Sequence, residues 1–282
     1  MQLLPLLISL ITTAVLATSA SATGLCDDFY ARLPNVKRAL CEDARLQASL
    51  ARSVKGRPIY LRDIHPDNAR LRVLVIGGIH GDELSSASVA LHWIGLAQAE
   101  SADINWRFIP ALNPDGLFSR PSKRPNAHGV DLNRNFPTPN WTSEAPIYWT
   151  QQTRKDPRRW PGKKALSEPE TKFLVEEMQR FKPNLIVSIH APYGLLDFDG
   201  PIPAPGRLGR LYLDQVGVFP GSLGNYGGVH KGMPVVTIEL ASALKTPSDA
   251  EMQRMWLDLR KWMDQRLTPS LTALAPVKSA TR

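Results

Sequence analysis

The apolar residues of this chain gather in short runs that alternate with segments of helical periodicity. The run at 72–76 (RVLVI) is followed by two glycines, and residues 84–97 repeat apolar side chains at the spacing of a helix. This order predicts a strand, a tight turn and a helix.

Three later runs, at 105–110, 184–189 and 235–240, also predict strands. The last two are apolar enough for strands buried on both faces of a sheet. His190 directly follows one of these runs, and Glu239 lies at the end of the other.

Helices are expected in three further places. Residues 39–52 form a short helical lead-in, and 249–267 repeat apolar residues at helical spacing. Ser167 with Glu170 three positions later is typical of a capped helix start, and this helix reaches about residue 181.

Strands that alternate with helices indicate an α/β fold, with a mixed, mostly parallel sheet flanked by helices on both faces. Residues 113–162 are rich in Pro, Asn, Gly and Arg and predict a long loop, which in a compact domain is commonly functional. In such sheets, ligands bind at the carboxyl ends of the strands.

The N-terminus has the features of a cleavable secretory signal. Residues 1–22 carry no charge, hold an apolar run at 3–16 and end in the small residues 20–22. An uncleaved anchor is the weaker alternative, because the run is shorter than the roughly 20 residues of a spanning helix. A lipid on Cys26 is disfavoured by the bulky Leu25 before it.

We expect export to the periplasm and no stable membrane insertion after cleavage. The chain then divides into a signal at 1–22, an N-terminal lead-in at 23–54, a main domain at 55–270 and a flexible tail at 271–282. The two cysteines, Cys26 and Cys41, are expected to form a disulfide in an oxidising compartment; two independent buried thiols are the alternative.

The chain is basic, with a formal net charge of +8, and basic residues crowd the segment 154–164. No aromatic-interleaved nucleic-acid motif accompanies them, so no nucleic-acid partner is expected. The basic segment is either a solvated loop or a contact for an anionic substrate or envelope polymer.

A possible metal site follows from three residues. His80 and Glu83 stand three positions apart where the first strand turns into its helix, and His190 ends a distant strand. Two histidines and one glutamate are a common ligand set of catalytic zinc, which leaves a fourth position for water. Each fragment alone is weak, since a lone histidine after an apolar strand is more often a hydrogen-bonded core residue.

Five motifs occur in a specific order: His80-Gly-Asp-Glu83, Asn113-Pro-Asp-Gly116, Gly129-Val-Asp-Leu-Asn-Arg-Asn-Phe-Pro137, Ser188-Ile-His190 and Thr237-Ile-Glu239-Leu240. Over about residues 55–267, this order resembles the zinc carboxypeptidase family of the carboxypeptidase A type. It is most similar to the small bacterial branch of murein peptide amidases. The resemblance implies one zinc ion per chain on His80, Glu83 and His190, with Glu239 as the general base.

The resemblance also implies how the substrate is held. Asn133 and Arg134 are expected to grip its terminal carboxylate, and Arg124 is expected to polarise the scissile carbonyl, with Arg120 as the alternative. The planar guanidinium of an arginine matches a carboxylate in a bidentate geometry.

Other polar residues have less specific expectations. Asp131 is assigned to scaffolding of the loop. Asp197 and Asp199 either face the substrate or, for Asp199, take part in a turn with the following Gly-Pro. Larger family members place a tyrosine over the substrate, and Tyr212 and Tyr226 are the candidates that flank the corresponding segment.

By this resemblance we expect a zinc metallopeptidase that hydrolyses a peptide or γ-amide bond next to a free C-terminal carboxylate. A murein peptide is the expected substrate, with the bond between γ-D-glutamate and diaminopimelate as first candidate; no protein partner is expected. A zinc-dependent deacylase of N-acyl amino acids, similar to succinylglutamate desuccinylase and aspartoacylase, stays open. A non-catalytic envelope-binding module is the other alternative, although a binder has no need of Glu239 as a base.

Overall fold

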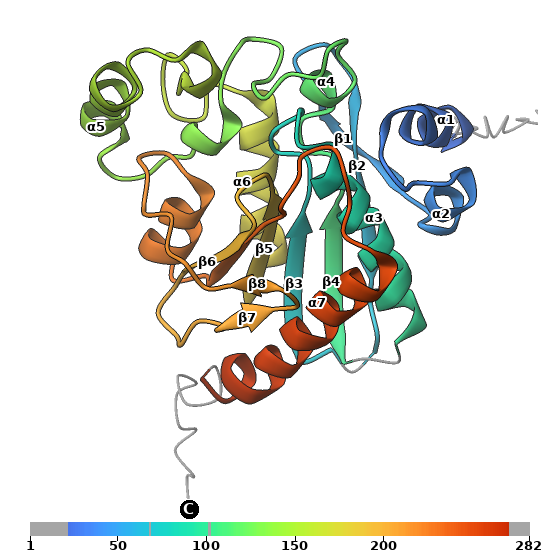
Figure 1. The fold of residues 1–282 in the computed structure, drawn as a ribbon. Coiled ribbons are helices and arrows are strands. Elements are labelled where there is room, and N and C mark those ends of the chain that lie inside the picture. The colour runs from blue at the N-terminus through green and yellow to red at the C-terminus, as the bar shows by residue number, and fades with distance from the viewer. Residues whose placement is uncertain (1–21, 68, 101–102, 271–282) are drawn as a thin grey trace, which may run out of the picture.

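The centre of the molecule is a seven-stranded sheet, seen in a computed structural model that describes residues 22–67, 69–100 and 103–270 (Figure 1). The predicted signal, apart from Ala22, and the predicted tail at 271–282 lie outside the described residues. In spatial order the strands are β1 (Gln47–Arg52), β2 (Pro58–Ile64), β4 (Ile104–Ile109), β3 (Leu71–Ile76), β5 (Leu185–His190), β9 (Val235–Glu239) and β6 (Leu195–Asp199).

The four central strands β4, β3, β5 and β9 run parallel to one another. The antiparallel strands lie outside them: β2 pairs with β4, β1 pairs with β2, and β6 pairs with β9. The carboxyl ends of the parallel strands therefore meet at one edge of the sheet, as expected from the sequence.

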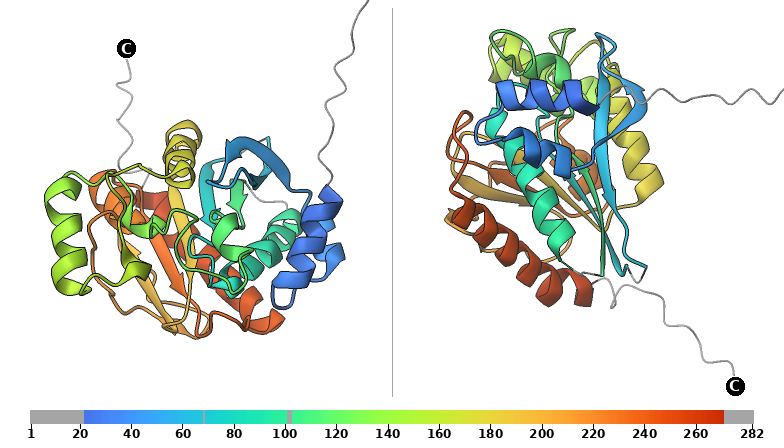
Figure 2. Two further views of the ribbon diagram at one scale, coloured as in Figure 1. Left: turned by 90° about the horizontal axis from the view of Figure 1, so that it is seen from above. Right: turned by 90° about the vertical axis from the view of Figure 1, so that its right-hand side faces the viewer.

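Helices cover both faces of the sheet, so the predicted mixed α/β architecture is confirmed (Figure 2). On one face, α3 (Leu84–Ala99) and α7 (Asp249–Trp262) share a core with alternate strand residues such as Val73 and Val75. On the other face, α6 (Pro169–Phe181) shares a second core with the residues between them, such as Leu74.

The remaining elements are short: α4 (Pro114–Leu117), η1 (Leu132–Arg134), α5 (Trp141–Ile147), η2 (Tyr148–Gln152), η3 (Pro157–Arg159), β7 (Arg207–Leu208), β8 (Leu211–Tyr212), η4 (Gly224–His230) and η5 (Met263–Leu267). Figure 1 shows α4 and α5 at the end of the sheet toward which the parallel strands run. The expected long loop at 113–162 thus contains the short helices α4, η1 and η3 and one continuous helical segment formed by α5 and η2, and it covers the edge where the site residues gather.

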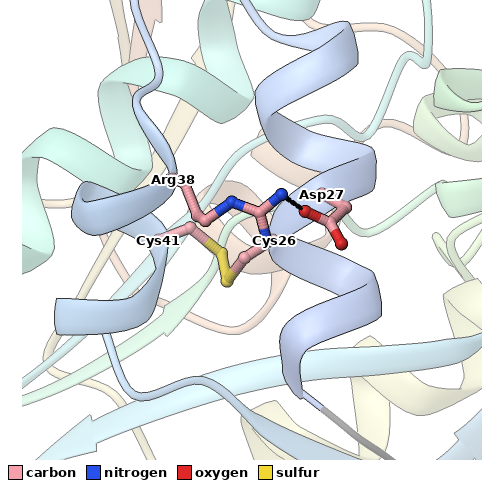
Figure 3. The surroundings of a disulfide bond; sticks show 4 residues. All are labelled: Cys26, Asp27, Arg38 and Cys41. Atoms are coloured by element: carbon pink, nitrogen blue, oxygen red, sulfur yellow. Dashed lines mark ion pairs between the residues drawn. A yellow bond between two sulfur atoms is a disulfide. The ribbon is translucent and has the colours of Figure 1, made fainter.

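The lead-in contains two helices, α1 (Ala22–Arg32) and α2 (Arg38–Asp43), joined by the predicted Cys26–Cys41 disulfide. Figure 3 shows this bridge beside the ion pair of Asp27 with Arg38. Both cysteines are buried in the core that α3 and α7 share.

Two expectations about local structure were wrong. The predicted helix at 39–52 ends at Asp43, and Gln47–Arg52 is the edge strand β1, because pairing with β2 outweighs the helix propensity of this Ala- and Leu-containing segment. Ser167 does not cap α6: the N-cap is Glu168, and the Ser167 hydroxyl donates to the Glu168 carboxylate instead.

No helix in the described part of the chain is long and apolar enough to cross a membrane.

Removing the disulfide should destabilise the fold without affecting the site directly. A Cys26→Ala/Cys41→Ala double variant removes a crosslink between residues 15 positions apart. In chain-entropy models, closing a loop of this size stabilises the folded state by about 3 kcal/mol. We expect urea titration to show a loss of about 2–4 kcal/mol in the free energy of unfolding. Unchanged stability relative to the oxidised protein would contradict a stabilising role of the bridge.

Candidate active site

The site residues come from the carboxyl ends of three neighbouring parallel strands. His80 and Glu83 lie in the turn after β3, His190 is the last residue of β5, and Glu239 is the last residue of β9. His190 and Glu239 are direct partners in the register of the two strands. Residues that lie far apart in the sequence therefore converge on one point at the edge of the sheet.

Close backbone packing fixes the turn that carries His80 and Glu83. A Cβ atom on Gly81 would lie 2.2 Å from the carbonyl carbon of Gly116 in α4, so only glycine fits here. The Gly81 N–H donates to the Arg124 carbonyl over 3.3 Å. These contacts hold the turn against the loop that it faces.

The side chains of His80, Glu83 and His190 bring three possible ligand atoms together. His80 Nδ1 lies 2.8 Å from Glu83 Oε1, and His190 Nδ1 lies 3.1 Å from Glu83 Oε2 and 3.2 Å from His80 Nδ1. A tetrahedral zinc ion with bonds of about 2.0–2.1 Å separates its ligands by about 3.4 Å. All three residues are buried, and their chemistry and spacing fit a zinc ion.

Asp131 orients His80. The second ring nitrogen, His80 Nε2, donates to Asp131 Oδ1 over 3.1 Å, which leaves Nδ1 free of a proton on the side of Glu83 and His190. Burial opposes the charge of Asp131, but the charge on Arg124 and the hydrogen bond from His80 hold the pKa of this carboxyl well below its usual range. From the sequence we expect Asp131 to stabilise the loop. Its hydrogen bond with His80 shows that it also contacts a possible metal ligand.

Arg124 links this network to a cavity. Its guanidinium donates from Nε to Asp131 over 3.1 Å and from Nη1 to Glu83 over 3.2 Å. It also lines a cavity of about 100 Å³ together with the three possible ligands and Glu239. Arg120, the sequence alternative, is exposed and is not among the residues lining this cavity.

Arg134 is a buried cation in the same cavity. Its side chain lies over the ring of Phe219 at 4.5 Å, its Nη1 donates to the Asn133 carbonyl, and its Nε has no hydrogen-bond partner within the described ranges. Burial lowers the pKa of Arg134 despite the nearby charge of Asp131. A buried cation with an unused donor is costly and favours an anionic ligand.

Asn133 lies beside Arg134, and its carboxamide oxygen already accepts a hydrogen bond. Its Oδ1 accepts the N–H of Leu223 over 2.8 Å, which ties the loop before η4 to this side of the cavity. Asn133 lines the cavity, and the carboxamide nitrogen is its remaining donor for a substrate.

Glu239 has an unused acceptor. Its Oε2 is buried and has no hydrogen-bond partner in the part of the chain that the structure describes, and the residue is 8% exposed. Burial raises the pKa of Glu239, and the carboxylate of Glu83 adds to this rise, whereas His190 opposes it. A carboxylate in this setting accepts a proton more readily than an exposed one.

The tyrosine candidates do not reach the cavity. Tyr212 is 63% exposed on β8, and Tyr226 is buried with its ring stacked on Phe136. Tyr193, which sequence analysis did not consider, lines the cavity and is 57% exposed. Its position three residues after His190 was the available signal.

Comparison with known proteins identifies the family. The model of the zinc carboxypeptidase family matches residues 43–196, more than half of the chain. The chain belongs to the zinc carboxypeptidases. This confirms the predicted family and a zinc metallopeptidase activity, and the His80–Glu83–His190 cluster is where the described residues fit the metal.

Two bacterial relatives are named murein peptide amidase A. Murein peptide amidase A of Vibrio campbellii is 31% identical over 199 residues, which cover 68% of this chain and 78% of that protein. Murein peptide amidase A of Escherichia coli K12 is 34% identical over 148 residues, or 52% of this chain and 59% of the relative.

Solved structures agree on the fold. The murein-tripeptide amidase of Escherichia coli O157 superposes with a TM-score of 0.54 at 26% identity and covers 75% of this chain and 88% of its own. A carboxypeptidase A from Helicoverpa armigera, at 17% identity, shares the fold with a TM-score of 0.61 over 84% of this chain and 71% of its own.

Zinc binding should depend on the histidines and on the partner of His80. We expect His80→Ala and His190→Ala to lose the metal, and Asp131→Asn to weaken zinc affinity by about 10- to 100-fold because His80 loses its orienting carboxylate. Metal analysis and chelator competition measure this. The control is His65→Ala, which removes a half-exposed histidine outside the site. Full zinc content in His80→Ala would remove this residue from the site.

Proposed function

We propose that the enzyme hydrolyses a peptide or γ-amide bond next to a free C-terminal carboxylate. The observation that carries this proposal is Arg134, a buried guanidinium whose Nε lacks a partner in the cavity shared by Glu239 and the possible metal ligands. A substrate carboxylate supplies the anion that this cation lacks. It would also fix the C-terminal residue beside the reacting groups.

We further propose murein peptides as substrates, with the bond between γ-D-glutamate and diaminopimelate as the first candidate. The support is the name of the relatives, which are murein peptide amidases at 31% and 34% identity. A secreted, periplasmic location would place the enzyme beside murein, and the Cys26–Cys41 disulfide favours an oxidising compartment.

Each side chain has a role in the proposed reaction. His80, Glu83 and His190 would hold the zinc ion, which supplies a Lewis acid for the carbonyl oxygen and lowers the pKa of water. Glu239 takes a proton from the attacking water at its free Oε2 and passes it to the leaving amine. Arg134, with Asn133 beside it, binds the terminal carboxylate.

Arg124 is the proposed partner of the scissile carbonyl. It lines the cavity next to Glu83 and is held in place by Asp131, so its orientation is set before substrate arrives. A cation fixed in this way stabilises negative charge on the carbonyl oxygen without reorganising during the reaction. Neither the deacylase nor the non-catalytic alternative gains support from the site or the comparisons.

Replacing Glu239 should reduce hydrolysis while leaving the fold intact. We expect Glu239→Gln to keep the fold and the zinc but to lose turnover by at least about 10²- to 10⁴-fold, because the amide cannot accept a proton. Glu176→Gln, a matched change on the exposed side of α6, should retain full activity. Turnover of a murein tripeptide, zinc content and melting temperature are measured on the same preparations. If Glu239→Gln kept a third of wild-type turnover, Glu239 would not be the base.

A carboxylate clamp makes a specific kinetic prediction. Amidating the substrate's C-terminus should lower kcat/KM of the wild type by about 10- to 100-fold, as expected for the loss of a charge-assisted pair. The same amidation should have little effect on Arg134→Ala, because the partner is already absent. Arg210→Ala, at an exposed position, serves as the control and should respond like the wild type. Equal sensitivity of Arg134→Ala and wild type would assign Arg134 another role.

A further inference from the structure

A second cavity, here called the outer cavity, adjoins the candidate active site on the side of Arg124. Its volume is about 550 Å³, within the usual range of small-molecule sites. Arg124 lines both this cavity and the catalytic cavity, which holds Glu239 and the possible metal ligands. We propose that the outer cavity binds the N-acetylmuramyl sugar at the N-terminal end of a murein peptide, so that the enzyme prefers peptides that still carry this sugar. This inference rests on the proposed function, because it places the scissile bond of that peptide in the catalytic cavity.

An intermediate cavity of about 180 Å³ adjoins both of the others. It shares Glu83, Arg124 and Tyr193 with the catalytic cavity, and Arg124 and Arg158 with the outer cavity. Arg134, the proposed partner of the terminal carboxylate, lines only the catalytic cavity of these three. A substrate held at its C-terminus by Arg134 and at its scissile carbonyl by Arg124 therefore extends its N-terminal part toward the outer cavity.

The intermediate cavity suits the residue next to the scissile bond. A D-glutamate linked through its γ-carboxyl keeps its α-carboxylate free, so this residue carries a negative charge. Arg158 and Arg159 of η3 both line the intermediate cavity. Guanidinium groups match a carboxylate in geometry and charge. A γ-D-glutamyl residue at this point leaves the alanine and its sugar to reach the outer cavity.

Two tryptophans give the outer cavity an aromatic lining. Trp149 belongs to η2 and Trp160 follows η3, and both are half-buried, so part of each ring is accessible. The indole N–H of Trp149 donates to the Asp156 carbonyl over 2.8 Å, which fixes the orientation of this ring. A sugar presents C–H groups on the faces of its ring and hydroxyl groups at its edge. Its face therefore suits an aromatic ring that has polar groups beside it.

Cationic donors surround the two rings. Lys55, Lys123 and Arg158 line the outer cavity and are exposed. Their side chains donate hydrogen bonds and accept none, so they suit the hydroxyl and acetamido oxygens of the sugar. From the sequence, the basic segment 154–164 is either a solvated loop or a contact for an anionic substrate or envelope polymer. Arg158 and Trp160 place part of this segment at a cavity beside the site.

The wall of the outer cavity is attached to the candidate metal site. The Trp160 carbonyl accepts the N–H of Asp131, which orients His80, over 2.8 Å. Arg158 Nη2 donates to Asp82 Oδ2 over 2.8 Å, and Asp82 lies in the turn that follows β3. These contacts hold the aromatic lining in place relative to the reacting groups. A ligand that spans both cavities therefore loses less free energy to ordering of the protein.

The kinetic test compares L-alanyl-γ-D-glutamyl-meso-diaminopimelate with the same peptide carrying N-acetylmuramic acid, using the zinc-loaded enzyme. We expect kcat/KM to be about 3- to 10-fold higher for the muramyl peptide, as for one aromatic contact. Trp149→Ala and Trp160→Ala should each bring this ratio closer to one, and Trp160→Phe should keep part of it. Tyr30→Ala, at an exposed position of α1, serves as the control and should leave the ratio unaltered.

A binding measurement tests the same site without turnover. Calorimetry compares N-acetylmuramyl-L-alanyl-D-glutamate with L-alanyl-D-glutamate, which both lack the C-terminal residue. We expect the muramyl compound to bind with about 3- to 10-fold lower Kd in the wild type, and the difference to shrink in Trp160→Ala.

The outcomes separate this inference from the proposed function. If the wild type cleaves both peptides equally well and binds both dipeptides equally, the outer cavity does not bind the sugar, although the proposed function stands. If both Ala variants fold and retain the full preference, the sugar binds elsewhere and the inference is wrong. No turnover of either peptide would remove the proposed murein peptidase activity, whereas the calorimetry would still decide on the sugar. The wild-type comparisons decide the question even if a variant does not fold.

Discussion

The parallel register between β5 and β9 is the constraint on which the site depends. It sets His190 directly opposite Glu239, so that a possible metal ligand and the proposed base share one face of the sheet. A slip by one residue would turn one of these side chains toward the opposite core. The apolar residues on both strands prevent this slip, because Val187, Ile189, Val236 and Ile238 all pack into the core shared by α3 and α7. The chemistry is thus held in place by packing on the far side of the sheet.

The charged residues around this point fall into two groups. Glu83 and Asp131 face the two histidines, and Arg124 bridges both carboxylates. In contrast, Arg134 Nε and Glu239 Oε2 have no hydrogen-bond partner among the described residues. The first group is satisfied within the protein and is therefore suited to hold a fixed geometry. The second group faces the cavity with its binding capacity unused.

Much of this arrangement could be predicted from the sequence, for a physical reason. His190 and Glu239 each end an apolar run, and the ends of buried parallel strands meet at one edge, so their convergence follows from the strand pattern alone. The strand β6 was missed because its five residues run into Gly-Pro, although the alternation of Leu196 and Phe198 with Asp197 and Asp199 was the available signal. The contact of Asp131 with His80 joins residues 51 positions apart, and no local pattern encodes it. The helix predicted over 47–52 is wrong because the pairing of this segment with β2 is a tertiary effect that its local sequence does not encode.

The close contact of Gly81 with Gly116 has a consequence for inheritance. A Cβ atom on Gly81 would meet the backbone of Gly116, and one on Gly116 would lie 2.5 Å from the Lys123 carbonyl oxygen and 2.9 Å from that of Pro125. The His80 and Asn113 motifs and the segment 123–125 therefore touch at a point with no space for a side chain. A side chain at Gly81 or Gly116 would meet backbone atoms, which cannot move aside as a flexible side chain could. Descendants of this chain are expected to keep glycine at both positions.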